Sequence, residues 1–304
     1  MRAVYYSLAD FPEDSREQQW TQSIRSLRRY NSTIPVWLLL FAGASRELRQ
    51  EAESQNVCVH DLGDYGEFMK RAHPRGSILA LYPTFHKFLV LQQLPLPETT
   101  QLLYLDCDTF FFGDVTPLFD LHSENDWYAR EEPRSQRSHL GYNPRHVDEF
   151  LLQYIARSES VRYVPPFNSG VCIMNRAVWK RFNALSEAYL DFAWHLLCGR
   201  ELGEHEFELT DPRIRPAVMN ALTEEDRSRA IPYPSANDWI IEQIALWLTM
   251  GKLPQLSLGT LSPDQVLQGG EYETALAPGH RHILAHYFSV GQRAFFAAVP
   301  PIPG

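Results

Sequence analysis

Short apolar segments alternate with helical patterns over the first third of the chain. The apolar segments cover residues 3–7, 36–41, 57–59 and 102–105, and helical spacing of apolar residues covers 17–30, 45–54 and 82–94. Segments that are apolar throughout are typical of strands buried on both faces. Buried strands separated by helices predict a mainly parallel sheet that helices cover on both sides, which is an α/β fold.

The second half of the chain is less regular. We predict strands at 127–130, 171–174 and 282–288, and helices at 176–198 and 238–250. Residues 201–234 are polar and contain several prolines, which indicates loops and short helices. No internal repeat and no linker interrupts the chain, so we predict one domain over residues 1–304.

The charge balance excludes some classes of function. The chain has 37 acidic and 28 basic residues, with a net charge of -9 at pH 7. Sequence-independent binding of nucleic acid needs a basic surface, so we expect no nucleic-acid partner.

No apolar run approaches the roughly 20 residues of a transmembrane segment, and the amino end lacks the pattern of a signal peptide. We therefore expect a cytoplasmic protein. Peripheral association with a membrane stays an open alternative.

The four cysteines do not form a CxxC pair. They are Cys58, Cys107, Cys172 and Cys198, and two of them, Cys107 and Cys172, lie inside apolar runs. We interpret all four as buried thiols in a reducing compartment and not as disulfide partners.

The sequence feature with the clearest chemistry follows the strand predicted at 102–105. There the chain reads Asp106-Cys107-Asp108. Alternation along a strand would place both carboxylates on one face, and ligands of parallel sheets bind at the carboxyl ends of strands. Two neighbouring carboxylates repel each other unless a cation lies between them, and carboxylate oxygens suit Mn²⁺ or Mg²⁺. In the alternative interpretation, both aspartates only end a strand in solvent, since so short a motif often occurs by chance.

Further motifs follow in a fixed order. Phe167-Asn-Ser-Gly comes next, then the Glu242-Gln243 pair, and then His286. With the Asp-x-Asp motif, this order resembles the GT-A glycosyltransferases, especially the glycogenin-like glycosyltransferase family 8, over residues 3–287. The resemblance implies a single Rossmann-like GT-A domain with a mainly parallel central sheet flanked by helices. It also implies a nucleotide-binding half at 1–120 and a donor-sugar and acceptor half at 121–293. The proline- and glycine-rich end of the chain predicts a flexible tail at 294–304.

The resemblance assigns roles to single positions of this chain. It implies that Asp106, Asp108 and His286 bind Mn²⁺ or Mg²⁺, with Asp106 also near the donor ribose. Glu242 and Gln243 match a catalytic Asp-Gln pair that orients the donor sugar. The remaining positions that the resemblance places at the nucleotide sugar are Ser7, Leu8, Ala9, Lys87, Cys107, Asn168, Ser169, Gly170 and Arg293.

Some positions depart from the family pattern or leave a choice. Glu242 stands where the family has Asp, and Ser289 stands where it has Gly, so that Arg293 takes the place of a late lysine. His282 has the same strand parity as His286 and is the alternative metal ligand. Glu131 and Glu132 follow the strand at 127–130 and either enter the cleft or form a solvated turn.

The resulting prediction is a metal-dependent enzyme that transfers a sugar from a nucleotide-diphosphate sugar with retention of configuration. UDP is the expected nucleotide by analogy, and the acceptor is a glycan, a lipid, a protein or a small molecule. A haloacid dehalogenase-type phosphatase also has a strand that ends in Asp-x-Asp, but its motif requires Thr or Val at the position of Phe110. A sugar-nucleotide pyrophosphorylase would need a glycine-rich basic loop, which residues 7–15 lack. A non-catalytic sugar-nucleotide or glycan-binding protein on the same fold is the third alternative.

Overall fold

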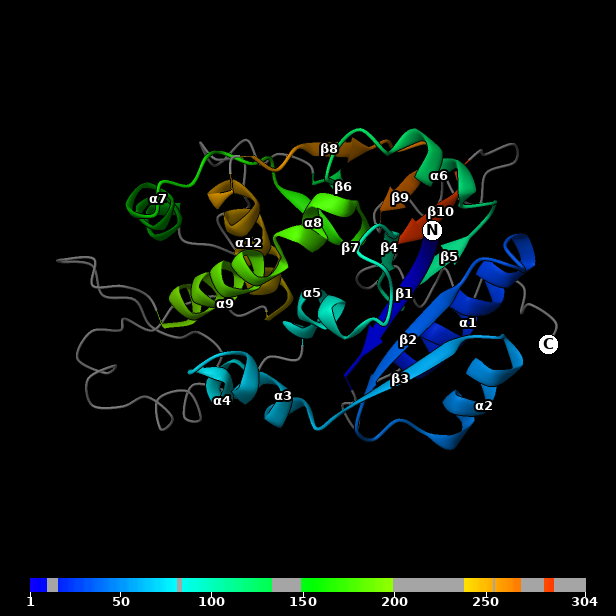
Figure 1. The fold of residues 1–304 in the computed structure, drawn as a ribbon. Coiled ribbons are helices and arrows are strands. Elements are labelled where there is room, and N and C mark those ends of the chain that lie inside the picture. The colour runs from blue at the N-terminus through cyan, green and yellow to red at the C-terminus, as the bar shows by residue number, and fades with distance from the viewer. Residues whose placement is uncertain are drawn as a thin grey trace.

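The computed structural model describes residues 1–9, 16–80, 84–132, 149–198, 238–253, 255–268 and 282–286, and the statements below refer to these residues. A seven-stranded sheet lies at the centre, with the strand order β3-β2-β1-β4-β7-β6-β8 (Figure 1). A second sheet of three strands has the order β5-β10-β9.

The first half of the central sheet is parallel, as predicted. It consists of β1 (Arg2–Leu8), β2 (Val36–Phe41), β3 (Cys58–Gly63) and β4 (Gln101–Leu105). The connecting helices are α1 (Arg16–Tyr30), α2 (Arg46–Ser54), α3 (Tyr65–Ala72), α4 (Gly76–Leu79), α5 (His86–Leu89) and the 3-10 helix η1 (Val90–Gln93). The helix expected at 82–94 is therefore shorter over its described part, and residues 82–83 lie outside the description.

The second half of the sheet contains one reversed strand, β7 (Phe167–Met174). It runs antiparallel to β4 and to β6 (Trp127–Glu131), whereas β8 (Leu258–Leu261) is parallel to β6. The helices here are α6 (Thr116–Leu121), α7 (Glu149–Ser158), α8 (Arg176–Lys180), α9 (Phe182–Cys198) and α12 (Asp238–Lys252). Because β7 is reversed, its first residues lie beside the carboxyl end of β4, where the Asp-x-Asp motif begins.

The second sheet is formed by three-residue strands that are far apart in the sequence. It contains β5 (Thr109–Phe111), β9 (Val266–Gln268) and β10 (Leu284–His286). β10 is antiparallel to β5, with His286 opposite Thr109. The sequence patterns had predicted β10 but neither β5 nor β9, and residues 287–288 of the expected strand lie outside the description.

Alternation along the strands divides the apolar core into two clusters, one on each face of the central sheet. Tyr5 and Tyr104 point into the cluster that α9 and α12 complete. Tyr6 and Leu103, each one residue away along its strand, point into the cluster that Trp20 of α1 completes. The sheet is thus buried on both faces, which explains why its strands are apolar throughout.

The interpretation of the cysteines is correct only in part. Cys107 and Cys172 are buried free thiols, but Cys58 is exposed. Cys58 begins β3, which is an edge strand with solvent beside it. The Cys198 side chain lies outside the described residues.

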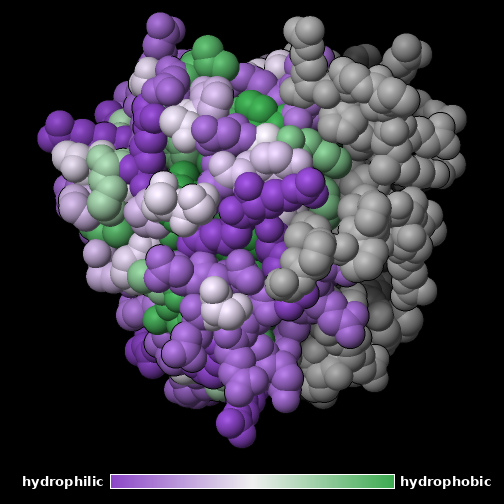
Figure 2. Space-filling view, turned by 90° about the vertical axis from the view of Figure 1, so that its right-hand side faces the viewer, coloured by the Kyte–Doolittle hydropathy of each residue, from purple (hydrophilic) through white to green (hydrophobic). Residues whose placement is uncertain are grey.

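The outer surface near α1 and α2 is mostly hydrophilic, and its hydrophobic residues are scattered (Figure 2). Scattered apolar residues are normal on a protein surface, whereas a large apolar patch would indicate a contact area. Over the residues described, no helix combines the length and the apolar character needed to cross a membrane.

Candidate active site

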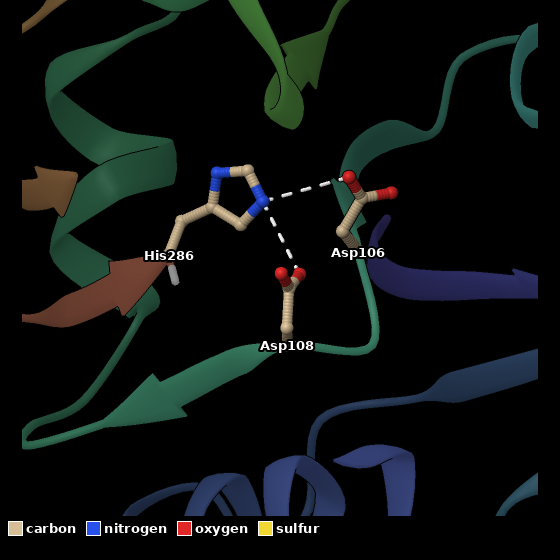
Figure 3. Close-up of side chains that lie close together, drawn as sticks. All are labelled: Asp106, Asp108 and His286. Atoms are coloured by element: carbon tan, nitrogen blue, oxygen red, sulfur yellow. Dashed lines mark ion pairs between the residues drawn. The ribbon is translucent and has the colours of Figure 1, made fainter. Parts of the chain in front are cut away.

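The Asp-x-Asp motif lies in the connection between β4 and β5. The strand itself ends at Leu105, so a turn, and not the expected strand alternation, directs Asp106 and Asp108 toward one place (Figure 3). The side chain of Cys107 between them is buried in the apolar cluster under α1. The thiol therefore points into the core, and burial raises its pKa well above the usual value.

His286 reaches the same place from β10. Its Nε2 lies 3.2 Å from Asp108 Oδ1 and 3.5 Å from Asp106 Oδ2 (Figure 3). The pairing of β10 with β5 sets this position, because His286 is opposite Thr109, the residue that follows Asp108. The alternative ligand, His282, lies instead at the surface, where its Nδ1 is 3.0 Å from the carbonyl oxygen of Pro263.

These three side chains fit a divalent cation. Two carboxylate oxygens and one imidazole nitrogen lie within 4.8 Å of one another, and this mixed set suits Mn²⁺ and similar ions. Gly170 has no side chain, and this leaves the space that the three side chains of the cluster occupy. A Cβ atom at Gly170 would lie 2.1 Å from His286 Cε1 and 2.8 Å from Asp106 Oδ2, so no larger residue fits without displacing a ligand.

A partly buried cation lies beside the cluster. Lys87 Nζ donates a hydrogen bond of 2.9 Å to Asp106 Oδ2 and lies 3.8 Å from Glu242 Oε2. Burial alone would raise the pKa of Asp106, but the charge of Lys87 and the contact with His286 hold it well below its usual range. Burial would likewise lower the pKa of Lys87, and the two carboxylates raise it instead. Both groups are therefore charged at neutral pH.

The two carboxylates of the cluster favour the protonated form of its histidine. Burial opposes its positive charge, but Asp108 and Asp106 raise the pKa of His286 to about 9. A metal ion needs the neutral imidazole, so its binding would displace this proton.

The pair Glu242-Gln243 on α12 holds the start of β7. The Ser169 hydroxyl donates to Glu242 Oε2 over 2.9 Å, and the Ser169 backbone N–H donates to Gln243 Oε1 over 3.1 Å. Burial raises the pKa of Glu242 to about 7, although Lys87 opposes the change. Glu242 Oε1 is buried and has no hydrogen-bond partner among the described residues.

The sequence profile of "Glycosyl transferase family 8" matches residues 22–194. This chain belongs to glycosyl transferase family 8. It is therefore a glycosyltransferase, which removes the phosphatase alternative.

Solved structures of glycosyltransferases resemble the whole fold. The galactosyltransferase LgtC, in complex with donor and acceptor sugar analogs, is 13% identical over 100% of this chain and 98% of its own, with a TM-score of 0.51. The bifunctional enzyme WbbM in its apo form is 13% identical over 95% of this chain and 46% of its own, with a TM-score of 0.51. Mouse xyloside xylosyltransferase 1 in its apo form is 14% identical over 94% of this chain and 97% of its own, with a TM-score of 0.49. No curated protein sequence matches the chain. The fold is GT-A, as the order of motifs implied.

Three other positions that the family 8 resemblance singled out lie near the same edge of the sheet. Ser7 and Leu8 end β1, the parallel neighbour of β4, and Ala9 follows them; all three are buried. The Ser7 hydroxyl has no hydrogen-bond partner among the described residues. Arg293 lies outside the description.

Asn168 is fixed at both ends of its amide. Its Oδ1 accepts from the backbone N–H of Gly170 over 2.8 Å, and its Nδ2 donates to Glu132 Oε1 over 3.0 Å. The contact holds the Glu132 carboxylate against the Asn168 amide, and whether Glu132 enters a cleft or forms a solvated turn stays a prediction. Sequence patterns could not decide between the two, because Glu132 is held by a residue of another strand.

The sequence patterns did not indicate the contact of Tyr104 with the Asp-x-Asp motif. The Tyr104 hydroxyl donates to Asp106 Oδ1 over 2.5 Å. Tyr104 stands two residues before Asp106, so alternation could have placed it on the same side. Inside an apolar strand, however, a tyrosine is indistinguishable from a core residue.

Proposed function

We propose that this family 8 enzyme transfers a sugar from a nucleoside-diphosphate sugar to an acceptor, with a divalent metal and with retention of anomeric configuration. The observation that carries the proposal is the cluster of Asp106, Asp108 and His286 at the carboxyl end of β4, around a glycine that no larger residue can replace. UDP is the nucleotide that we expect from the family.

In this proposal Asp106, Asp108 and His286 hold Mn²⁺ or Mg²⁺. When bound, such an ion offsets the negative charge that develops on a leaving diphosphate. Lys87 brings a second positive charge, which lies 2.9 Å from Asp106 Oδ2. The chain's own net charge of -9 makes such local positive charge necessary for binding an anionic donor.

The donor sugar would lie against the start of β7 and α12. Asn168, Ser169 and Gly170 form one wall, and the buried Glu242 carboxylate holds the Ser169 hydroxyl from behind. Gln243 fixes the backbone of Ser169, so that this wall keeps its shape. Family membership supports retention, in which the acceptor attacks the face from which the diphosphate leaves. The LgtC structure, which contains donor and acceptor sugar analogs, supports a GT-A site that takes both.

The test is thermal unfolding with Mn²⁺ and a panel of nucleoside diphosphates. We expect UDP to raise the melting temperature only when Mn²⁺ is present, since a ligand at a hundredfold excess over its Kd stabilises the folded state by about 2.7 kcal/mol. Asp108→Ala should abolish this shift. Asp120→Ala is the matched control, because Asp120 is exposed and pairs with Arg2 at the surface.

The outcomes separate the parts of the proposal. If no nucleoside diphosphate stabilises a folded wild type with or without metal, the proposed donor site is wrong. If the donor binds and is never consumed with any acceptor, the chain is a binding protein on the same fold. Where product forms, NMR of its anomeric proton reports configuration, and inversion would exclude the retaining mechanism.

A further inference from the structure

Both oxygens of Asp106 are held, and by different partners. Oδ1 accepts the hydrogen bond of the Tyr104 hydroxyl at 2.5 Å. Oδ2 accepts the bond of Lys87 at 2.9 Å and faces His286 Nε2 at 3.5 Å. A carboxylate fixed at both oxygens cannot rotate about its Cβ–Cγ bond, so one chosen oxygen is presented to the cluster.

The sheet fixes Tyr104 in turn. Tyr104 is opposite Tyr5 in the parallel pairing of β4 with β1, and the two ring centroids are 5.0 Å apart. Both rings are buried in the apolar cluster that α9 and α12 cover. The ring therefore has no space in which to turn away from Asp106.

We propose that Tyr104 is a positioning residue whose hydroxyl orients Asp106 for binding a divalent cation. The inference rests on the metal site of the proposed function and deepens it, because it names the group behind the ligand. Partners of this kind typically change metal affinity by about 10- to 100-fold when they are removed. Burial and the charge of Asp106 raise the pKa of Tyr104 well above its usual value, so the phenol keeps the proton that it donates.

The chain offers a matched control in Tyr5. It is the same residue type, on the neighbouring strand, at the same level and with the same burial. Among the described residues, its hydroxyl bonds to the backbone oxygen of Lys87, at 3.4 Å, and to no side chain of the cluster. Tyr5→Phe thus removes a buried hydroxyl from the same apolar environment without touching Asp106.

The experiment is a titration with Mn²⁺, followed by the electron paramagnetic resonance signal of the free ion, for wild type, Tyr104→Phe and Tyr5→Phe. It is run with and without UDP, at a temperature at which the melting curves show all three proteins folded. We expect Tyr104→Phe to raise the Kd for Mn²⁺ about tenfold. We expect Tyr5→Phe to stay within about twofold of wild type, since it leaves the contacts of Asp106 intact.

Each result has one meaning. Unchanged Mn²⁺ affinity in folded Tyr104→Phe overturns the inference and leaves the proposed function intact. An equal loss in both variants also overturns it, since the cause would then be the shared packing and not the Tyr104 hydroxyl. If wild type binds no Mn²⁺ with or without UDP, the metal part of the proposed function fails, and the role of Tyr104 fails with it.

Discussion

The three side chains that we propose to hold a metal come from two regions of the molecule that are built in different ways. Asp106 and Asp108 follow β4 in the parallel half of the sheet. In this half, neighbouring strands are parallel and helices connect them along the chain. His286 comes from β10, which joins the site only by pairing with β5. Gly170 comes from β7, the reversed strand. The parallel half thus supplies a preformed carboxylate pair, and long-range pairing completes the site.

The largest effect should follow the loss of the long-range ligand. We expect His286→Ala to weaken Mn²⁺ binding by more than the roughly 100-fold that losing an outer partner can cost. His282→Ala is the control from the same segment and should bind Mn²⁺ as wild type does, because His282 contacts Pro263 at the surface. Calorimetric titration measures both. Equal losses in the two variants would mean that β10 only supports the site.

The next effect concerns the reversed strand. Gly170→Ala places a Cβ atom 2.1 Å from His286 Cε1, which forces a ligand to move. A displacement of about 1 Å at a reacting centre can cost on the order of 100-fold, so we expect kcat/KM to fall by about that factor. Gly113→Ala is the control, since its added Cβ would come no closer than 4.0 Å to Ile283. Normal turnover by Gly170→Ala would show that the cluster does not need this close approach.

A smaller effect concerns the buried carboxyl of α12 and depends on pH. Burial raises the pKa of Glu242 to about 7 in the folded protein, above the unfolded value of about 4.3. The folded state then binds the extra proton between these values, so the contribution of Glu242 to stability falls as pH rises from about 4.5 to 7 and is constant above. Glu242→Gln does not titrate and so lacks this decrease. We expect its free energy of unfolding, relative to that of wild type, to rise by on the order of 2 kcal/mol between pH 5 and pH 8.

Thermal unfolding at both pH values measures this gain. Glu53→Gln changes an exposed carboxylate of α2 and serves as the control that should follow wild type. A gap between Glu242→Gln and wild type that stays constant with pH would mean that Glu242 does not titrate in this range.

The smallest effect should be confined to the parallel half. Ser45 Oγ accepts from the backbone N–H of Leu48 and caps α2. Ser45→Ala should lower the free energy of unfolding by about 1 kcal/mol, the usual cost of losing such a cap. Mn²⁺ affinity and kcat should not change, which a denaturant titration beside an activity assay can check. Loss of metal binding in this variant would contradict the independence of the two regions.

The same division explains what the sequence could predict. In the parallel half, strands such as Val36–Phe41 and helices such as Arg16–Tyr30 follow from local apolar patterns, and the structure confirms them. β5 and β9 are three residues long and depend on distant pairing, so no local pattern indicates them. The reversed strand β7 begins at Phe167, before the predicted start at 171. The apolar pattern left out Asn168 and Ser169 because they are polar, although contacts with other elements bury them in the structure.

The candidate site divides in the same way. Asp106 and Asp108 were predicted from the strand before them, but their convergence depends on a turn. His286 was chosen over His282 only through the order of motifs, since strand parity is the same for both. The contact between Tyr104 and Asp106 needed the structure, because it depends on where a buried hydroxyl points. The division at residues 120 and 121 and the tail at 294–304 stay predictions.

The exposed thiol at the sheet edge offers a practical handle. Of the three described cysteine side chains, Cys58 is exposed, while Cys107 and Cys172 are buried. A maleimide dye should therefore react with Cys58 before it reacts with the other two, since thiol modification requires access. Cys58 stands at the amino end of β3, whereas the cluster lies beyond the carboxyl end of β4. A fluorophore attached there would leave Asp106, Asp108 and His286 untouched.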